Sequence, residues 1–155
     1  MLNIILCDDD RFILNLAGEQ IENEILKNHL DAQISCKTAQ SYEVFQYLKN
    51  NDGAYLIFLD LDFGNGKLNG IDVAKQVKVI RSNAKVVFVT NHHEMAMQVL
   101  SNGVEPFGFL EKTTDMKQLS QGFAKYIHMA ITTFTPSMHK SDSVDYGCDY
   151  RDFRY

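Results

Sequence analysis

Short apolar segments alternate with segments of helical periodicity along this chain, and this alternation constrains the fold more than any other feature. The expected strands are residues 2–7, 33–38, 55–59, 85–90 and 106–111. Between them, apolar residues recur at helical spacing. Strands and helices that alternate in this way predict a parallel sheet with helices on both faces, joined by right-handed crossovers. The expected class is therefore α/β.

The expected helices follow from capping residues and apolar faces. Asp10 is expected to cap the first helix and Ser41 the second, because short polar side chains accept hydrogen bonds from the free N–H groups at a helix start. The apolar face of the first helix is expected to comprise Phe12, Ile13, Leu16, Ile21, Ile25 and Leu26. The last helix is expected from Asp115 to about Ile131, with Met116 facing inward.

Length and composition indicate one globular domain with a tail. The chain has 155 residues, of which 45% are apolar, and a net charge of −5. This charge argues against nucleic-acid binding by the chain unaided, since phosphate binding needs a basic face. No segment approaches the roughly 20 apolar residues of a membrane span, and the N-terminus lacks a signal-peptide pattern. Cys7, Cys36 and Cys148 are an odd number with no metal-like spacing, and this usage fits a reducing cytoplasm. We therefore expect a cytoplasmic location, and the lack of an apolar span predicts no membrane attachment.

Acidic residues follow two of the expected strands directly. Asp8, Asp9 and Asp10 come after the first strand, and Asp60 and Asp62 come at the end of the third. Carboxylates at the tips of neighbouring buried strands repel one another, and a hard divalent cation bound through oxygens neutralises such a cluster. We therefore expect Mg²⁺ to be held by Asp9 and Asp60, with Asp8 acting through water and the backbone carbonyl of Asp62 completing the coordination.

The remaining strand ends supply a hydroxyl and a cation. Thr90 ends the fourth strand and Lys112 follows the fifth. Ligands of open parallel sheets lie beyond the carboxyl ends of the strands, so these side chains are expected to share one site with the acids. A carboxylate can attack phosphorus and form an acyl phosphate, and Asp60 is the expected nucleophile. Thr90 and Lys112 would then contact the phosphoryl oxygens.

These residues, in this order and rough spacing, resemble the receiver domain of two-component response regulators. The resemblance covers about Leu2 to Ile131. It implies a flavodoxin-like (βα)5 doubly wound sheet with strand order 2-1-3-4-5. It also implies that a sensor histidine kinase phosphorylates Asp60, and that the domain signals rather than turning over a substrate. Phe109 matches the family's aromatic switch position, where it turns inward as Thr90 moves toward the phosphoryl group.

A closer resemblance is to receivers of LytTR-type regulators, which control quorum sensing and bacteriocin production. It rests on two stretches, 88–94 (Phe-Val-Thr-Asn-His-His-Glu) and 104–112 (Val-Glu-Pro-Phe-Gly-Phe-Leu-Glu-Lys). It implies that residues 132–155 are a linker and the start of an absent C-terminal LytTR domain, through which the whole protein binds DNA. A homodimer is expected through the face formed by the fourth helix, fifth strand and fifth helix.

Two departures from the receiver pattern concern the phosphoryl lifetime. Asn91 stands where most receivers have a small residue, and Thr113 stands where most have proline. A cis bond before a non-proline residue costs about 3 kcal/mol, so the Lys112–Thr113 bond is expected to be trans. Two other functions stay open on the sequence: a receiver-like module that no longer takes phosphate, and a haloacid-dehalogenase-type phosphatase. Such phosphatases carry Asp-x-Asp on their first strand, whereas here the acid pair comes first.

Overall fold

The computed structural model describes residues 1–62, 69–91 and 95–134, which form a five-stranded parallel sheet of order β2-β1-β3-β4-β5. The strands are β1 (Leu2–Cys7), β2 (Ala32–Thr38), β3 (Ala54–Asp60), β4 (Lys85–Thr90) and β5 (Gly108–Glu111). The helices are α1 (Arg11–Asn28), α2 (Ser41–Asn50), α3 (Gly70–Ile80), α4 (Met95–Ser101) and α5 (Met116–Phe134). The expected α/β fold and strand order are confirmed.

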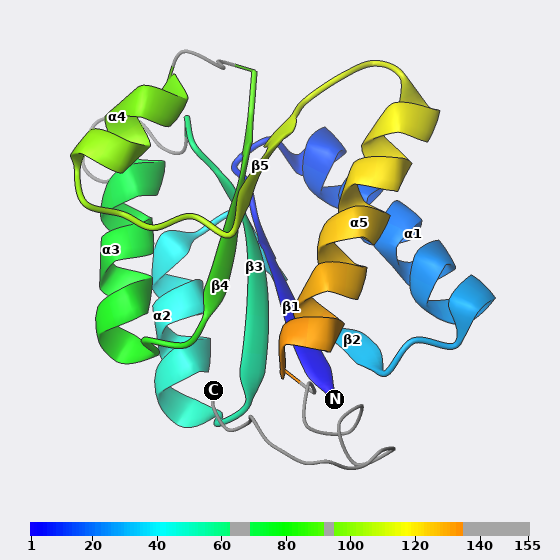
Figure 1. The fold of residues 1–155 in the computed structure, drawn as a ribbon, viewed down its shortest axis with the longest axis horizontal. Coiled ribbons are helices and arrows are strands. Elements are labelled where there is room, and N and C mark those ends of the chain that lie inside the picture. The colour runs from blue at the N-terminus through cyan, green and yellow to red at the C-terminus, as the bar shows by residue number, and fades with distance from the viewer. Residues whose placement is uncertain (63–68, 92–94, 135–155) are drawn as a thin grey trace, which may run out of the picture.

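The helices cover both faces of the sheet. Figure 1 shows α1 and α5 on one face and α2, α3 and α4 on the other. Two apolar cores result, one on each side, and the central strand β3 contributes to both. Phe58 packs edge-on against Phe123 of α5 at 5.0 Å between ring centroids, whereas Leu59 is buried on the opposite side. Because β3 is covered on both faces, its sequence is a continuous apolar run rather than an alternating one.

The structure corrects three details of the expected helices. In α1 the buried residues are Leu14, Ala17, Gly18 and Ile21, whereas Phe12 and Leu26 are 73% and 71% exposed. Ile21 is buried and Leu16 and Ile25 pack against the core as expected, so the expected face is wrong at Phe12 and Leu26. Contact with the sheet buries Leu14, Ala17 and Gly18 as well. Ser41 is the first helical residue, not the cap; Gln40 holds the cap position and makes no side-chain cap hydrogen bond. Met116 is 43% exposed.

The last strand and helix also differ in length from the expectation. Strand β5 begins at Gly108 rather than 106, and α5 continues to Phe134, three residues beyond Ile131. Gly108 is required where it stands, because a side chain there would overlap the ring of Tyr126 on α5. This close approach brings α5 against β5 just before the strand reaches the site. No helix among the described residues is long and apolar enough to span a membrane.

Candidate functional site

Four polar side chains lie at the carboxyl ends of the strands. Asp8 directly follows β1, Asp60 ends β3, Thr90 ends β4, and Lys112 directly follows β5. The parallel register keeps these ends level, since Cys7 pairs with Leu59 and Thr90 pairs with Glu111. Asp8, Asp60 and Thr90 are only 5%, 3% and 4% exposed. The apolar strands thus end in polar groups at one edge of the sheet, and the helices on both faces partly enclose these groups.

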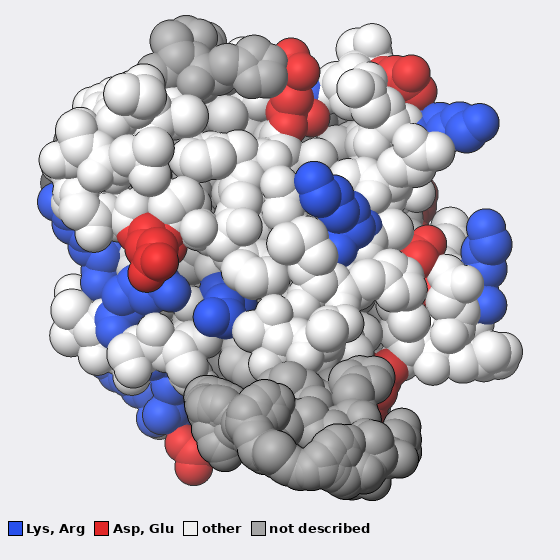
Figure 2. All heavy atoms as spheres, in the orientation of Figure 1, with Lys and Arg blue, Asp and Glu red and all other residues white. Residues whose placement is uncertain are grey.

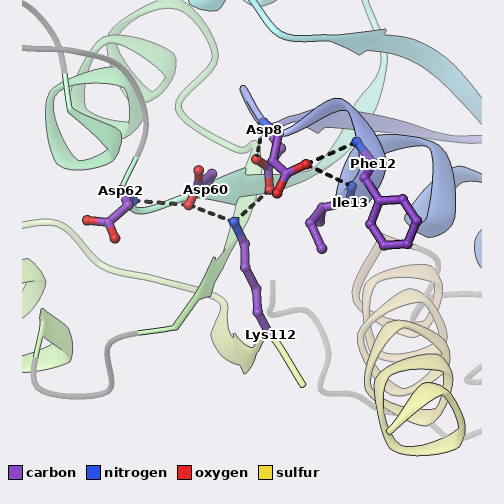
Figure 3. Close-up of polar contacts among 7 residues, drawn as sticks. Asp8, Phe12, Ile13, Asp60, Asp62 and Lys112 are labelled. Carbon is purple, nitrogen blue, oxygen red and sulfur yellow. Dashed lines mark hydrogen bonds and ion pairs between the residues drawn. The ribbon is translucent and has the colours of Figure 1, made fainter. Parts of the chain in front are cut away.

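Lys112 bridges two of the buried carboxylates. Its Nζ lies 2.9 Å from Asp8 Oδ2 and 3.2 Å from Asp60 Oδ1 (Figure 3). The backbone helps to place it, because the N–H of Lys112 donates to the carbonyl of Thr90 at 2.9 Å. The described residues contain no cis peptide bond, so the Lys112–Thr113 bond is trans as expected. The ammonium therefore reaches the acids without the cis turn that a following proline would favour.

The acids after β1 divide into two roles. Asp10 caps α1, since its carboxylate accepts from the N–H groups of Phe12 at 3.0 Å and Ile13 at 3.4 Å (Figure 3). The N–H of Asp10 in turn donates to Asp8 Oδ1 at 2.9 Å. Asp8 thus has one oxygen on the backbone and the other on Lys112, which holds it in the site. The expectation that Asp10 serves the helix is confirmed.

Three carboxylates lie close enough to share a cation. One oxygen from each of Asp8, Asp9 and Asp60 can be chosen so that all lie within 4.8 Å of one another. Asp9 is exposed, whereas the other two are buried. Oxygen donors are the ligands that Mg²⁺ prefers, and each of these three side chains offers a carboxylate oxygen. The donor set therefore fits the expected ion.

The electrostatics of Asp60 reflect this crowding. Its pKa is raised from the ordinary 3.8 to about 6, first because burial penalises the carboxylate and next because Asp8 repels it. Lys112 and the N–H of Asp62, which donates to Asp60 Oδ1 at 3.1 Å, act in the opposite direction. Burial lowers the pKa of Lys112, but hydrogen bonding and charge from Asp8 and Asp60 outweigh it, so the net direction is upward.

The backbone behind Asp60 is packed without spare room. A Cβ on Gly70, the first residue of α3, would lie 2.5 Å from the carbonyl oxygen of Asp60 and 2.7 Å from the Cα of Leu61. The N–H of Gly70 donates to the Leu61 carbonyl at 3.2 Å. Asp62 is exposed and faces away from Lys112 in Figure 3. Residues 63–68, which follow Asp62, lie outside the described residues.

Phe109 lies on β5 beside Phe88 of β4, with ring centroids 5.8 Å apart and planes at 25°. Side chains alternate along a strand, so Phe88 and Thr90 share a face of the sheet, and Phe109 shares it with them. Sequence reasoning missed Tyr126, whose hydroxyl donates to the carbonyl of Phe109 at 3.0 Å. Its place between Phe123 and Ile127 on α5 suggested only core packing.

Solved receiver domains share this fold. The response regulator TrrA of Thermotoga maritima, solved in complex with Mg²⁺–BeF, aligns with a TM-score of 0.63 and 20% identity over 81% of this chain and 99% of that chain. NtrX of Brucella abortus aligns with a TM-score of 0.68 and 18% identity over 88% of this chain and 30% of that chain. At these identities the likeness shows the fold alone.

Two curated relatives are similar in sequence. Accessory gene regulator protein A of Staphylococcus epidermidis is 25% identical over 113 residues, which cover 72% of this chain and 46% of the relative. Sensory transduction protein LytT of Bacillus subtilis is 25% identical over 126 residues, which cover 81% of this chain and 48% of the relative. The chain spans about half the length of these relatives, and they agree with the LytTR-type resemblance.

The family model described as the response regulator receiver domain matches residues 4–124. That segment runs from β1 into α5 and contains all four polar strand ends described above. The match decides against a haloacid-dehalogenase-type phosphatase, in agreement with the order of the acidic motifs along the chain. The chain belongs to the response regulator receiver family.

Proposed function

We propose that this chain receives a phosphoryl group from a sensor histidine kinase on the carboxylate of Asp60. One observation carries the proposal: Asp60 is a buried carboxylate at a strand end, and the Lys112 ammonium lies 3.2 Å from it. In the transfer, the P–N bond of the phosphohistidine breaks as an oxygen of Asp60 forms a P–O bond, and the electron pair returns to the histidine nitrogen.

The neighbouring side chains take separate parts in this step. Lys112 pairs with the carboxylates before transfer and with the phosphoryl oxygens after it, because its ammonium is a compact charge on a flexible stem. Thr90 donates its hydroxyl to a phosphoryl oxygen. The N–H of Asp62 holds one oxygen of Asp60, which leaves the other oxygen for the attack. Phe109 is the proposed switch residue, since it lies on the same face of the sheet as Thr90.

Asp8, Asp9 and Asp60 would hold Mg²⁺, with the backbone carbonyl of Asp62 as a further ligand. When bound, the ion supplies positive charge against the phosphoryl oxygens. The approach of one oxygen from each of the three carboxylates to within 4.8 Å of the others supports this assignment. The domain then acts as a signalling phosphoacceptor that stores the group, not as an enzyme with turnover. Asn91, directly after Thr90, is placed to influence how long the group is stored.

The partners follow from the same assignment. The kinase is the phosphodonor, and a homodimer through α4, β5 and α5 is the proposed output. Met97 and Leu100 of α4 support this surface, because they are 72% and 52% exposed and apolar. Residues 132–155 are proposed to lead into a LytTR domain that binds DNA, and all but 132–134 lie outside the described residues. A cytoplasmic location without membrane attachment stays a prediction.

A small phosphodonor and Mg²⁺ test the assignment of Asp60. We expect intact-mass spectrometry of the chain treated with acetyl phosphate to show one added phosphoryl group. Asp60→Asn removes the nucleophilic oxygen, so this variant is expected to stay unmodified. Asp62→Asn is the matched control, because it removes a nearby exposed carboxylate and keeps the N–H that Asp60 accepts.

Other outcomes of this experiment would sink or replace the proposal. A phosphoryl group that persists in Asp60→Asn would place the acceptor elsewhere. No modification with any donor, in a wild-type chain that still binds beryllofluoride and Mg²⁺, would point to slow transfer rather than a lost site. If the wild-type chain neither takes a phosphoryl group nor binds beryllofluoride and Mg²⁺, the result would favour the receiver-like module that no longer takes phosphate.

A further inference from the structure

The ammonium of Lys112 depends for its position on the shortest strand of the sheet. β5 has four residues, Gly108–Glu111, and Lys112 follows it directly. β5 also lies at an edge of the sheet, so β4 is the only strand that pairs with it within the described part of the chain. The outer edge of such a strand carries backbone groups that need another partner. The contacts that cover this edge therefore decide how firmly Lys112 is held. Around this region, the surface in Figure 2 is largely uncharged.

Helix α5 covers the outer edge of β5 through Tyr126. The Tyr126 hydroxyl donates to the carbonyl of Phe109 at 3.0 Å, and the side chain is only 9% exposed. Its ring centroid lies 6.2 Å from that of Phe107. The same ring lies directly over Gly108, where a Cβ would be 2.2 Å from Tyr126 Cε1. Tyr126 thus contacts three consecutive residues, 107–109, on the segment that leads into the site.

A second residue of α5 continues this contact toward Lys112. Gly122 lies one turn before Tyr126, and a Cβ there would be 2.2 Å from Leu110 Cδ1. Apolar packing of this kind is non-directional, whereas the Tyr126 hydroxyl fixes β5 at one backbone atom. That hydrogen bond lies three residues before Lys112, whose own N–H donates to the carbonyl of Thr90 at 2.9 Å. The backbone that carries the ammonium is therefore anchored from both sides, by β4 and by α5.

We propose that Tyr126 is a positioning residue for Lys112. Its hydroxyl holds the outer edge of β5, so that the ammonium reaches Asp8 at 2.9 Å and Asp60 at 3.2 Å. Tyr126 acts through the strand, and Lys112 is the group that meets the phosphoryl oxygens. The consequence for phosphoryl binding rests on the proposed function, whereas the placement of Lys112 can be measured without it.

Tyr126→Phe in the full 155-residue chain tests this role, because it removes the hydroxyl and keeps the ring. We expect hydrogen exchange at the backbone amide of Lys112 to be about 2- to 10-fold faster than in wild type, the factor that corresponds to one lost hydrogen bond of ordinary net strength. Beryllofluoride in the presence of Mg²⁺ should bind more weakly by a similar factor. Mg²⁺ alone should bind as tightly as in wild type, since the carboxylates of Asp8, Asp9 and Asp60 keep their places.

Tyr55→Phe is the matched control. The Tyr55 hydroxyl also donates to a backbone carbonyl, that of Asn51 at 2.7 Å, and its side chain is buried. Both variants should lower the urea midpoint of unfolding to a similar extent. Tyr55→Phe, however, should leave hydrogen exchange at Lys112 and the beryllofluoride affinity unchanged, because Tyr55 lies on β3 and does not contact β5.

Three results would overturn the proposal. The first is an unchanged exchange rate at Lys112 in Tyr126→Phe. The second is an equal acceleration in both variants, which would reflect lost overall stability. The third is a parallel loss of Mg²⁺ and beryllofluoride affinity, which would mean that the whole site has loosened. If the wild-type chain binds no beryllofluoride, the proposed function fails, and the exchange rate at Lys112 in the two variants still decides the role of Tyr126.

Discussion

The two ends of the central strands carry opposite electrostatic problems. At the carboxyl ends, Asp8 and Asp60 are buried and crowd around one ammonium, that of Lys112. At the amino-terminal end of β4, Lys78 and Lys85 are half-buried, and the carboxylate that acts on Lys78, that of Glu105, is not in an ion pair with it. Charge is therefore costly at the enclosed end, where it must be paired, whereas a charge at the open end is solvated by water.

The largest expected effect comes from removing Lys112, the cation that pairs with the buried carboxylates of Asp8 and Asp60. Lys112→Ala leaves Asp8 and Asp60 facing each other without a partner, and breaking a buried pair in this way costs about 3–5 kcal/mol. We expect urea unfolding at pH 8 to show that loss, and added Mg²⁺ to recover part of it. Lys117→Ala, which removes an exposed lysine from the start of α5, should change the free energy of unfolding little. Equal losses in both variants would contradict the contrast between the two ends.

The second effect is a pH dependence that belongs to Asp60. Its pKa is raised to about 6 in the folded chain, so the unfolded chain loses this proton first, and stability falls as pH rises from about 4 to about 6. Asp60→Asn removes this penalty and should be more stable than wild type by about 2–3 kcal/mol at pH 7, with a much smaller difference at pH 4. If the stability difference between Asp60→Asn and wild type does not change with pH, Asp60 is not the carboxyl group whose pKa is raised by folding. Mg²⁺ should narrow the difference at pH 7.

The third prediction compares two glycines: one beside Asp60 at the carboxyl ends of the strands, and one near the amino-terminal end of β4. Gly70→Ala puts a methyl group against the backbone of Asp60 and Leu61, and overpacking of this kind costs about 1–3 kcal/mol. Gly103 has a φ of 77° but open space around the position of a Cβ, so Gly103→Ala should cost only the strain of its backbone, about 1 kcal/mol. Thermal unfolding gives the two costs. Beryllofluoride binding should weaken for Gly70→Ala alone, because only that backbone adjoins Asp60.

The smallest effect is expected for the ion pair near the open end. Arg81 Nη2 lies 2.7 Å from Asp52 Oδ1, but the Asp52 side chain is 96% exposed. Asp52→Ala should therefore lower the free energy of unfolding by less than about 1 kcal/mol, and less still at high salt. Chemical denaturation in low and high salt checks this. A loss as large as that of Lys112→Ala would mean that burial does not separate the two ends.

Much of the fold could be predicted because it depends on local patterns. The five apolar runs and the helical segments between them led to the observed strand order through the receiver resemblance. It was harder to predict which face of a helix is buried and at which residue a helix begins. On α1, Phe12 was misjudged because both Phe12 and Leu14 lie on plausible apolar rows, and only contact with the sheet decides between them. Ser41 looks like a cap, but the polar groups preceding α2 are used elsewhere: the hydroxyl of Thr38 accepts from the N–H of Gln40 at 2.9 Å.

The residue types at the strand ends could be read from the sequence alone, because each directly follows or ends an apolar run: Asp8, Asp60, Thr90 and Lys112. The sequence could also assign Asp10 to the helix, since a cap reaches only two or three residues ahead. The tertiary structure alone decided that Lys112 bridges Asp8 and Asp60, that Gly70 seals the backbone behind them, and that Tyr126 binds the carbonyl of Phe109. These contacts join residues far apart in sequence, and their distances depend on how closely the helices pack against the sheet.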